Sequence, residues 1–81
     1  MNSDLIVACE DENFEVIRKY IRGGGDINVL DSLLINTASM KGKFAMVMFL
    51  IENGALFTDE TIRFARSGGF AQISEYLEQL R

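Results

Sequence analysis

The sequence predicts an all-α fold in which three helix pairs stack in a row. A segment that begins ACEDENFEVIRKYI at Ala8 recurs as ASMKGKFAMVMFLI at Ala38 and again as ARSGGFAQISEYL at Ala65. The apolar residues within each copy have helical spacing, and the alternation typical of a β-strand never persists over five residues. Self-similarity at intervals of thirty and twenty-seven residues is typical of stacked repeats, which need about three units for stability.

The first repeat is assigned to residues 3–30. Asn13 is well placed to cap its second helix, because an Asn side chain accepts a hydrogen bond from an unpaired N–H at a helix start. The apolar residues after Asn13 recur at i, i+1, i+4 and i+5, which predicts one stripe along that helix: Val16, Ile17, Tyr20 and Ile21.

The second repeat, residues 31–57, is the most apolar. Its first helix is expected over Ser32–Lys41, before Gly42, and its second over Phe44–Asn53. Gly54 would end the second helix, because glycine accepts the left-handed backbone found there at little cost. The high hydrophobicity follows if this repeat has a neighbour on both sides and therefore buries two faces. Leu50, at the centre of the second helix, is expected to be fully buried.

The third repeat covers residues 58–81. Thr58 is placed to cap its first helix, and Asp59 and Glu60 then lie in the first turn, where the helix dipole favours negative charge. Terminal repeats need polar outer faces. The two outer repeats supply such residues: Glu15, Arg18, Lys19, Gln72, Glu75 and Glu78.

Composition narrows the classes of function. The chain has 81 residues, enough for one domain, and a net charge of −4, which disfavours direct binding of nucleic acid and favours a basic protein partner. One cysteine and no histidine make a metal site or another cofactor unexpected. The sequence shows no signal peptide, and its longest apolar run is too short to cross a bilayer. A complete, cytoplasmic small protein, monomeric or weakly dimeric, is expected.

Catalytic chemistry finds little support in the residues. Cys9 lacks a histidine partner and is expected to be buried, and the carboxylates at 10–12 have no apolar pocket to shift their pKa. The glycines at 23–25 are not followed by the Lys-Ser/Thr of a phosphate-binding loop. The chain is therefore predicted not to be an enzyme.

The segments ENFEVIRKYIRGGGDIN and ASMKGKFAMVMFLIENGA resemble the second helix of the ankyrin repeat and the turn that follows it. The resemblance implies a short ankyrin-type solenoid of three degenerate repeats. The intervals are shorter than the 33 residues usual in the family, and the residues missing fall where ankyrin repeats form their β-hairpin fingers. The Thr-Pro-Leu-His signature is also absent. Truncated fingers are therefore expected.

The resemblance further implies a protein-binding module that uses its finger tips and the concave side of its first helices. The positions that correspond in this chain are Glu10, Asp11, Asn28, Asp31, Met40, Lys41, Asn53, Thr58 and Ser67. Met40 would be the central anchor. The competing hypothesis places binding, or homodimer formation, on the outer helix surface at Ala45 and Met48. Phe57 fits a core position and a binding position equally well.

Two functions remain open. One is a general adaptor that binds a basic partner through an acidic and apolar face. The other is a small viral or phage inhibitor, acting in the host cytoplasm, that blocks a host enzyme or defence protein by covering its nucleic-acid-binding surface. The short fingers and degenerate first helices resemble viral ankyrin repeats, which favours the second hypothesis by analogy only.

Overall fold

The computed structural model describes residues 2–81, and within this range the chain forms six α-helices and no strand. The helices are α1 (Asn2–Glu10), α2 (Phe14–Arg22), α3 (Val29–Met40), α4 (Phe44–Glu52), α5 (Asp59–Ser67) and α6 (Ala71–Leu80). The all-α prediction is thus confirmed for the described residues. None of these helices has the length and apolar character needed to cross a membrane.

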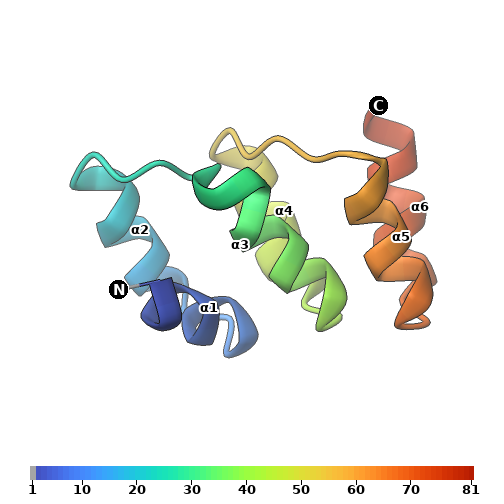
Figure 1. Cartoon of the computed structure of the whole chain (residues 1–81), viewed down its shortest axis with the longest axis horizontal. Coiled ribbons are helices and arrows are strands. Elements are labelled where there is room, and N and C mark those ends of the chain that lie inside the picture. Colours follow the sequence, from blue (N-terminus) through green and yellow to red (C-terminus); the bar gives the residue numbers. More distant parts are fainter. Residues whose placement is uncertain (1) are drawn as a thin grey trace.

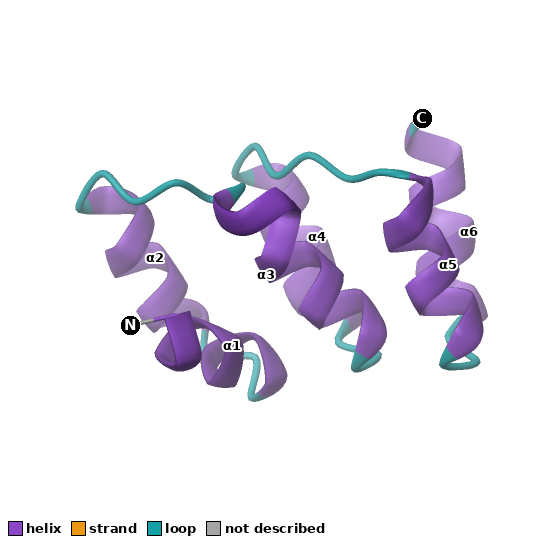
Figure 2. Cartoon of the chain, viewed as in Figure 1, coloured by secondary structure: helices purple, strands orange, loops and turns teal. Residues whose placement is uncertain are grey.

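The helices lie in two layers, with α1, α3 and α5 in front of α2, α4 and α6 (Figure 1). We call α1–α2 the first pair, α3–α4 the middle pair and α5–α6 the last pair. The middle pair lies between the other two, because α3 contacts both α1 and α5. Three tight turns lie at one end of the molecule and the two longer connections lie at the opposite end (Figure 2). Classification as an ankyrin-type solenoid stays a prediction.

The predicted caps form as expected. The Asn13 Oδ1 accepts a hydrogen bond from the Val16 N–H at 3.4 Å, and the Thr58 Oγ1 accepts one from the Glu60 N–H at 3.2 Å. Gly54 follows α4 with φ +96°, in the left-handed region that a Cβ would disfavour. The two hydrogen bonds mark where α2 and α5 begin, and the left-handed backbone of Gly54 marks where α4 ends.

The core runs through all three pairs. Ile17, Leu34, Met46, Leu50 and Leu77 are fully buried, which confirms the expectation for Leu50. The same aromatic contact recurs between successive pairs: the Phe14 and Phe49 ring centroids lie 5.2 Å apart, and those of Phe44 and Tyr76 lie 5.4 Å apart. Edge-to-face contacts of this kind stabilise a core beyond the area that they bury.

The apolar stripe predicted on α2 is only partly buried. Ile17 is fully enclosed, and Tyr20 and Ile21 are half-buried against the core. Val16, however, is 36% exposed. Instead of entering the core, its side chain borders a shallow surface depression together with Val7 of α1.

Candidate protein-binding surfaces

The predicted binding residues divide between the two ends of the molecule. We call the end with the tight turns, residues 11–13, 41–43 and 68–70, the turn end. We call the end with residues 23–28 and 53–58, together with the starts of α3 and α5 and the end of α6, the connection end. Five predicted residues lie at the turn end: Glu10, Asp11, Met40, Lys41 and Ser67. The other four lie at the connection end: Asn28, Asp31, Asn53 and Thr58.

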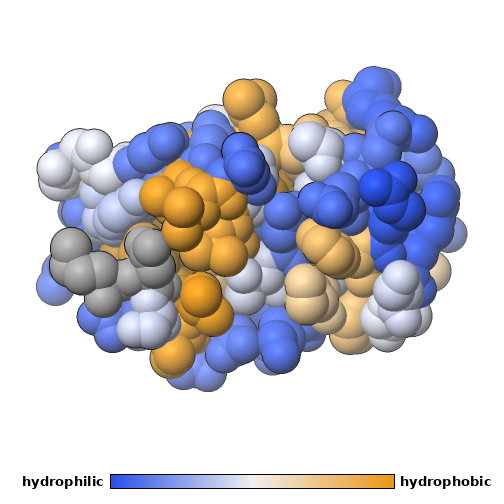
Figure 3. Space-filling model, viewed as in Figure 1, coloured by the Kyte–Doolittle hydropathy of each residue, from blue (hydrophilic) through white to orange (hydrophobic). Residues whose placement is uncertain are grey.

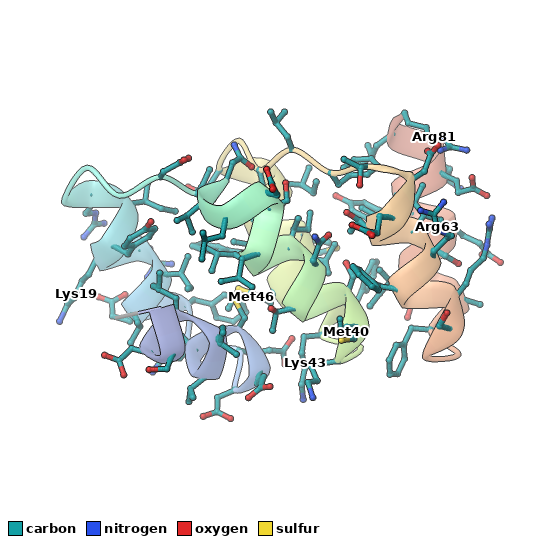
Figure 4. All side chains as sticks on the ribbon, viewed as in Figure 1. Lys19, Met40, Lys43, Met46, Arg63 and Arg81 are labelled. Atoms are coloured by element: carbon teal, nitrogen blue, oxygen red, sulfur yellow. The ribbon has the colours of Figure 1, made fainter. Side chains whose placement is uncertain are left out.

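At the turn end the structure brings equivalent positions of the three pairs together. The Lys41 Nζ lies 3.6 Å from the Glu10 Oε2, and a Cβ on Gly68 would touch the Met40 carbonyl oxygen at 3.4 Å. The side chains of Met40 and Lys43 point outward here (Figure 4), and Met40 is 44% exposed. Because Lys41 neutralises Glu10 and Lys43 lies nearby, the charge at this end is mixed rather than acidic.

A phenylalanine closes the turn end on the side of the last pair. Phe70 precedes α6, and its ring covers the positions that side chains on Gly42 and Gly68 would occupy. Gly42 also has φ +75°. Glycine is therefore required at position 42 for two reasons, the backbone conformation and the neighbouring ring.

At the connection end, two polar side chains hold the α4–α5 connection against the start of α3. The Leu56 N–H donates to the Asn28 Oδ1 at 2.7 Å, and the Ser32 hydroxyl donates to the Leu56 carbonyl at 2.9 Å. With both of its backbone groups bonded, Leu56 directs its side chain into solvent and is 68% exposed. The side-chain oxygen of Asn28 thus helps to hold the backbone of the apolar residue Leu56 in place.

The start of α3 has an unusual backbone. Leu30, Asp31 and Ser32 are three successive residues with positive φ, at +50°, +54° and +68°. Such left-handed residues are uncommon outside glycine, and each stores strain of about 1–3 kcal/mol. Regular right-handed helix follows Ser32, close to the predicted start of this helix. The left-handed turn contains Leu30, which is 62% exposed.

A polar chain connects the starts of α3 and α5. The Thr61 hydroxyl donates to the Asn36 Oδ1 at 2.5 Å, and the Thr58 N–H donates to the Thr61 Oγ1 at 3.2 Å. The Asn36 amide donates to the Asp31 carbonyl at 3.3 Å. Similarly, the Asn53 amide donates to the Phe49 carbonyl at 2.8 Å and closes the end of α4. Thr58 and Asn53 are exposed but use their polar atoms within the fold.

Sequence reasoning did not single out the leucines of the connection end. Leu30 and Leu56 are the two most exposed large apolar side chains of the described residues. Leu56 and Leu80 also border a shallow depression of about 250 Å³ between the α4–α5 connection and the end of α6. Apolar surface gathers over the start of α3 and projects at the connection end (Figure 3). The signal available was the presence of leucine within segments otherwise rich in Gly, Asn, Asp and Thr.

The single cysteine of the sequence lies in the interior of the fold. Cys9 is fully buried, and this burial, with a smaller effect from the Glu10 carboxylate, raises the pKa of its thiol from 9.0 to about 11. A thiol in this state is a poor nucleophile at neutral pH. Within residues 2–81, no three potential metal ligands lie close enough together to hold an ion.

Comparison with known proteins assigns the chain to no family. No protein-family model, no curated protein and no solved structure matches this chain. The fold and the geometry of its surfaces therefore carry the argument for function.

Proposed function

We propose that the chain is a non-enzymatic protein-binding module, built as a short ankyrin-type solenoid with truncated fingers. Two features support this architecture. The predicted repeats 3–30, 31–57 and 58–81 each contain most of one helix pair, with α1 beginning at Asn2 and α3 at Val29. The repeated contact of Phe14 with Phe49 and of Phe44 with Tyr76 is what equivalent interfaces between similar units would produce. The two longer connections lack strands, in line with shortened fingers.

We place binding at the connection end. The observation that carries this proposal is the pair of exposed leucines at the connection end, Leu30 and Leu56. Asn28 and Ser32, which flank Leu30 in the sequence, hydrogen-bond the backbone of Leu56. Large apolar side chains on a fixed backbone lose little conformational freedom when they enter a partner's pocket. The strain at residues 30–32 supports the same reading, because strained backbone often accompanies binding sites.

The charges around these leucines favour a basic partner. Asp26, Asp31 and Glu60 lie at the connection end and form no ion pair with any cation of the described chain, whereas Asp59 is paired with Arg81. At the turn end, by contrast, Lys41 pairs with Glu10. Unpaired carboxylates beside apolar anchors suit a segment that carries Leu or aromatic residues flanked by Lys or Arg. The carboxylates would mainly speed and orient its approach.

Selection from a randomised peptide-display library tests this proposal. We expect enriched peptides to combine apolar and basic residues, and their affinity to fall as salt rises, because long-range attraction is screened. The variant Leu30→Asp/Leu56→Asp should lose at least tenfold in affinity. The control Met40→Asp changes an apolar side chain of similar exposure at the turn end and should bind normally. Circular dichroism would check that both variants are folded.

The outcomes separate the two ends. Loss of binding in Met40→Asp with normal binding in Leu30→Asp/Leu56→Asp would place the site at the turn end, and acidic consensus peptides would contradict the charge argument. If no peptide is enriched above a scrambled-library background, the proposed binding function itself fails.

A further inference from the structure

We propose that two copies of the chain associate through the outer face of the first pair, related by a two-fold axis. This outer face consists of Asp4 and Val7 on α1, Asp11 in the turn that follows, and Val16 and Lys19 on α2. It lies on the side of the molecule away from the middle pair, and it is separate from the connection end. The inference therefore does not depend on which partner the connection end binds.

The outer face carries apolar residues at positions that are buried elsewhere in the chain. Val16 is 36% exposed, whereas Met46, thirty residues later, and Ile73, twenty-seven after that, are buried against the preceding pair. Val7 is 51% exposed, and its counterpart Thr37 is buried. Val7 and Val16 border a shallow depression of about 350 Å³ together with Asp4 and Asp11. In the other two pairs, helices of a neighbour fill this place.

The outer face of the last pair, at the other end of the row of pairs, carries a network of ion pairs. Arg66 and Glu78 occupy the positions at which the middle pair has the buried Ser39 and the half-buried Ile51. They form an ion pair at 2.5 Å, and Arg81 extends it to Glu78 and Asp59. A head-to-tail arrangement would have to bury these charges, at a desolvation cost that such pairs seldom recover. The outer face of the first pair therefore has a second copy of itself as its best match.

The charges on the outer face are self-complementary. Its carboxylates belong to Asp4 of α1 and to Asp11 of the turn that follows, whereas Lys19 projects from α2 away from the other pairs (Figure 4). At the position of Lys19 the other pairs have the aromatic residues Phe49 and Tyr76, which contact the preceding pair. A two-fold axis would place α1 of one copy over α2 of the other. Each copy then offers its carboxylates to the partner's Lys19, with the valines at the centre.

Sedimentation equilibrium of the whole chain tests the proposal between about 10 μM and 1 mM, the range expected for a small interface. We expect the average mass to rise from 9.1 kDa towards twice that value. Val16→Asp and Lys19→Glu should each keep the chain monomeric. The control Leu56→Asp, an exposed leucine at the connection end, should dimerise like the original chain. Circular dichroism would confirm that each variant is folded.

A charge-exchange experiment fixes the geometry. The variant Asp4→Lys/Asp11→Lys should be monomeric alone, as should Lys19→Glu, because each presents like charges to its own copy. An equal mixture of the two should form a heterodimer. The proposal is overturned if the original chain stays at 9.1 kDa at 1 mM, if the dimer survives Val16→Asp, or if mixing restores no association.

Discussion

The first and last helix pairs face solvent with different chemistry. On the last pair, Arg66 and Glu78 replace residues that are buried or half-buried in the middle pair, and they pair with each other. On the first pair, Asp4 and Lys19 take the places of the buried Leu34 and the aromatic Phe49, while Val7 and Val16 remain apolar and exposed. Both pairs have the same helix–turn–helix form, so the difference lies in the side chains at a few outward positions.

This difference shows which residues make a helix pair the terminal pair of a stack. A pair becomes a cap when charged residues replace the apolar ones that would face a neighbour. The last pair has this exchange at positions 66 and 78 of the sequence. The first pair has it at positions 4 and 19 and lacks it at positions 7 and 16. The outer face of the first pair therefore combines charged residues, as on a terminal repeat, with apolar residues, as on a surface between neighbouring repeats.

The largest expected effect is on stability, and it compares a substitution in the middle pair with one in the first pair. Leu50→Ala should lower the free energy of unfolding by about 2–5 kcal/mol, because it leaves a cavity at a fully buried site. Val16→Ala, on the exposed side of the first pair, should cost less than about 1 kcal/mol at low protein concentration. Urea unfolding followed by circular dichroism measures both. Equal costs would show that the middle pair is no better enclosed than the first.

The next effect compares two glycines with positive φ. Gly24→Ala, after α2, has open space around its new Cβ and should cost about 1–2 kcal/mol for the left-handed backbone alone. Gly42→Ala meets the Phe70 ring as well and should cost about 1–3 kcal/mol more. Thermal unfolding of the two variants gives the difference. If Gly42→Ala is no worse than Gly24→Ala, Phe70 does not hold the last pair against the middle one.

A third comparison concerns a thiol at equivalent positions of the first and last pairs. Cys9 is fully buried and should react slowly with an aromatic disulfide reagent in the native state. A new thiol at the matching exposed position, in the variant Cys9→Ala/Arg66→Cys, should react at least a hundredfold faster. Similar rates at the two positions would contradict the burial of Cys9 between the first and middle pairs.

The same thiol predicts a pH dependence. The pKa of Cys9 is raised to about 11 in the folded chain from an ordinary value of 9.0. Above pH 9 the unfolded chain releases this proton first, so stability falls as the pH rises from about 9 to 11 and is unaffected by Cys9 below that window. The full loss is about 2–3 kcal/mol. Cys9→Ala should lack this part of the fall, and urea unfolding at pH 8 and pH 10.5 measures it.

Much of the fold could be predicted because helix signals are local. Asn13, Thr58 and Gly54 mark helix ends through contacts with residues at most a few positions away, and all three predictions are confirmed. The left-handed turn at residues 30–32 could not be predicted, because Leu, Asp and Ser rarely adopt that backbone. It depends on contacts such as that of Ser32 with Leu56, twenty-four residues away.

The candidate surfaces were less accessible to sequence reasoning. Register correctly predicted that Glu10 and Lys41 would lie on the same face, and the structure places them 3.6 Å apart. Register alone could not show that Leu30 and Leu56 are exposed, because it does not describe how the segments between the repeats fold. Nor could the apolar stripe on α2 reveal that Val16 remains partly exposed, because periodicity describes one helix and not its neighbours.

The order of the helices also bears on how fast the chain folds. The main contacts join each helix to the next one or two along the chain, so only short loops must close before apolar surface is buried. Topologies with such local contacts fold in about microseconds to milliseconds. The sequence contains no proline, which removes the slow isomerisation that delays many proteins. A chain that reaches its native state this quickly leaves its exposed leucines and valines little time to aggregate before the rest of the core closes beneath them.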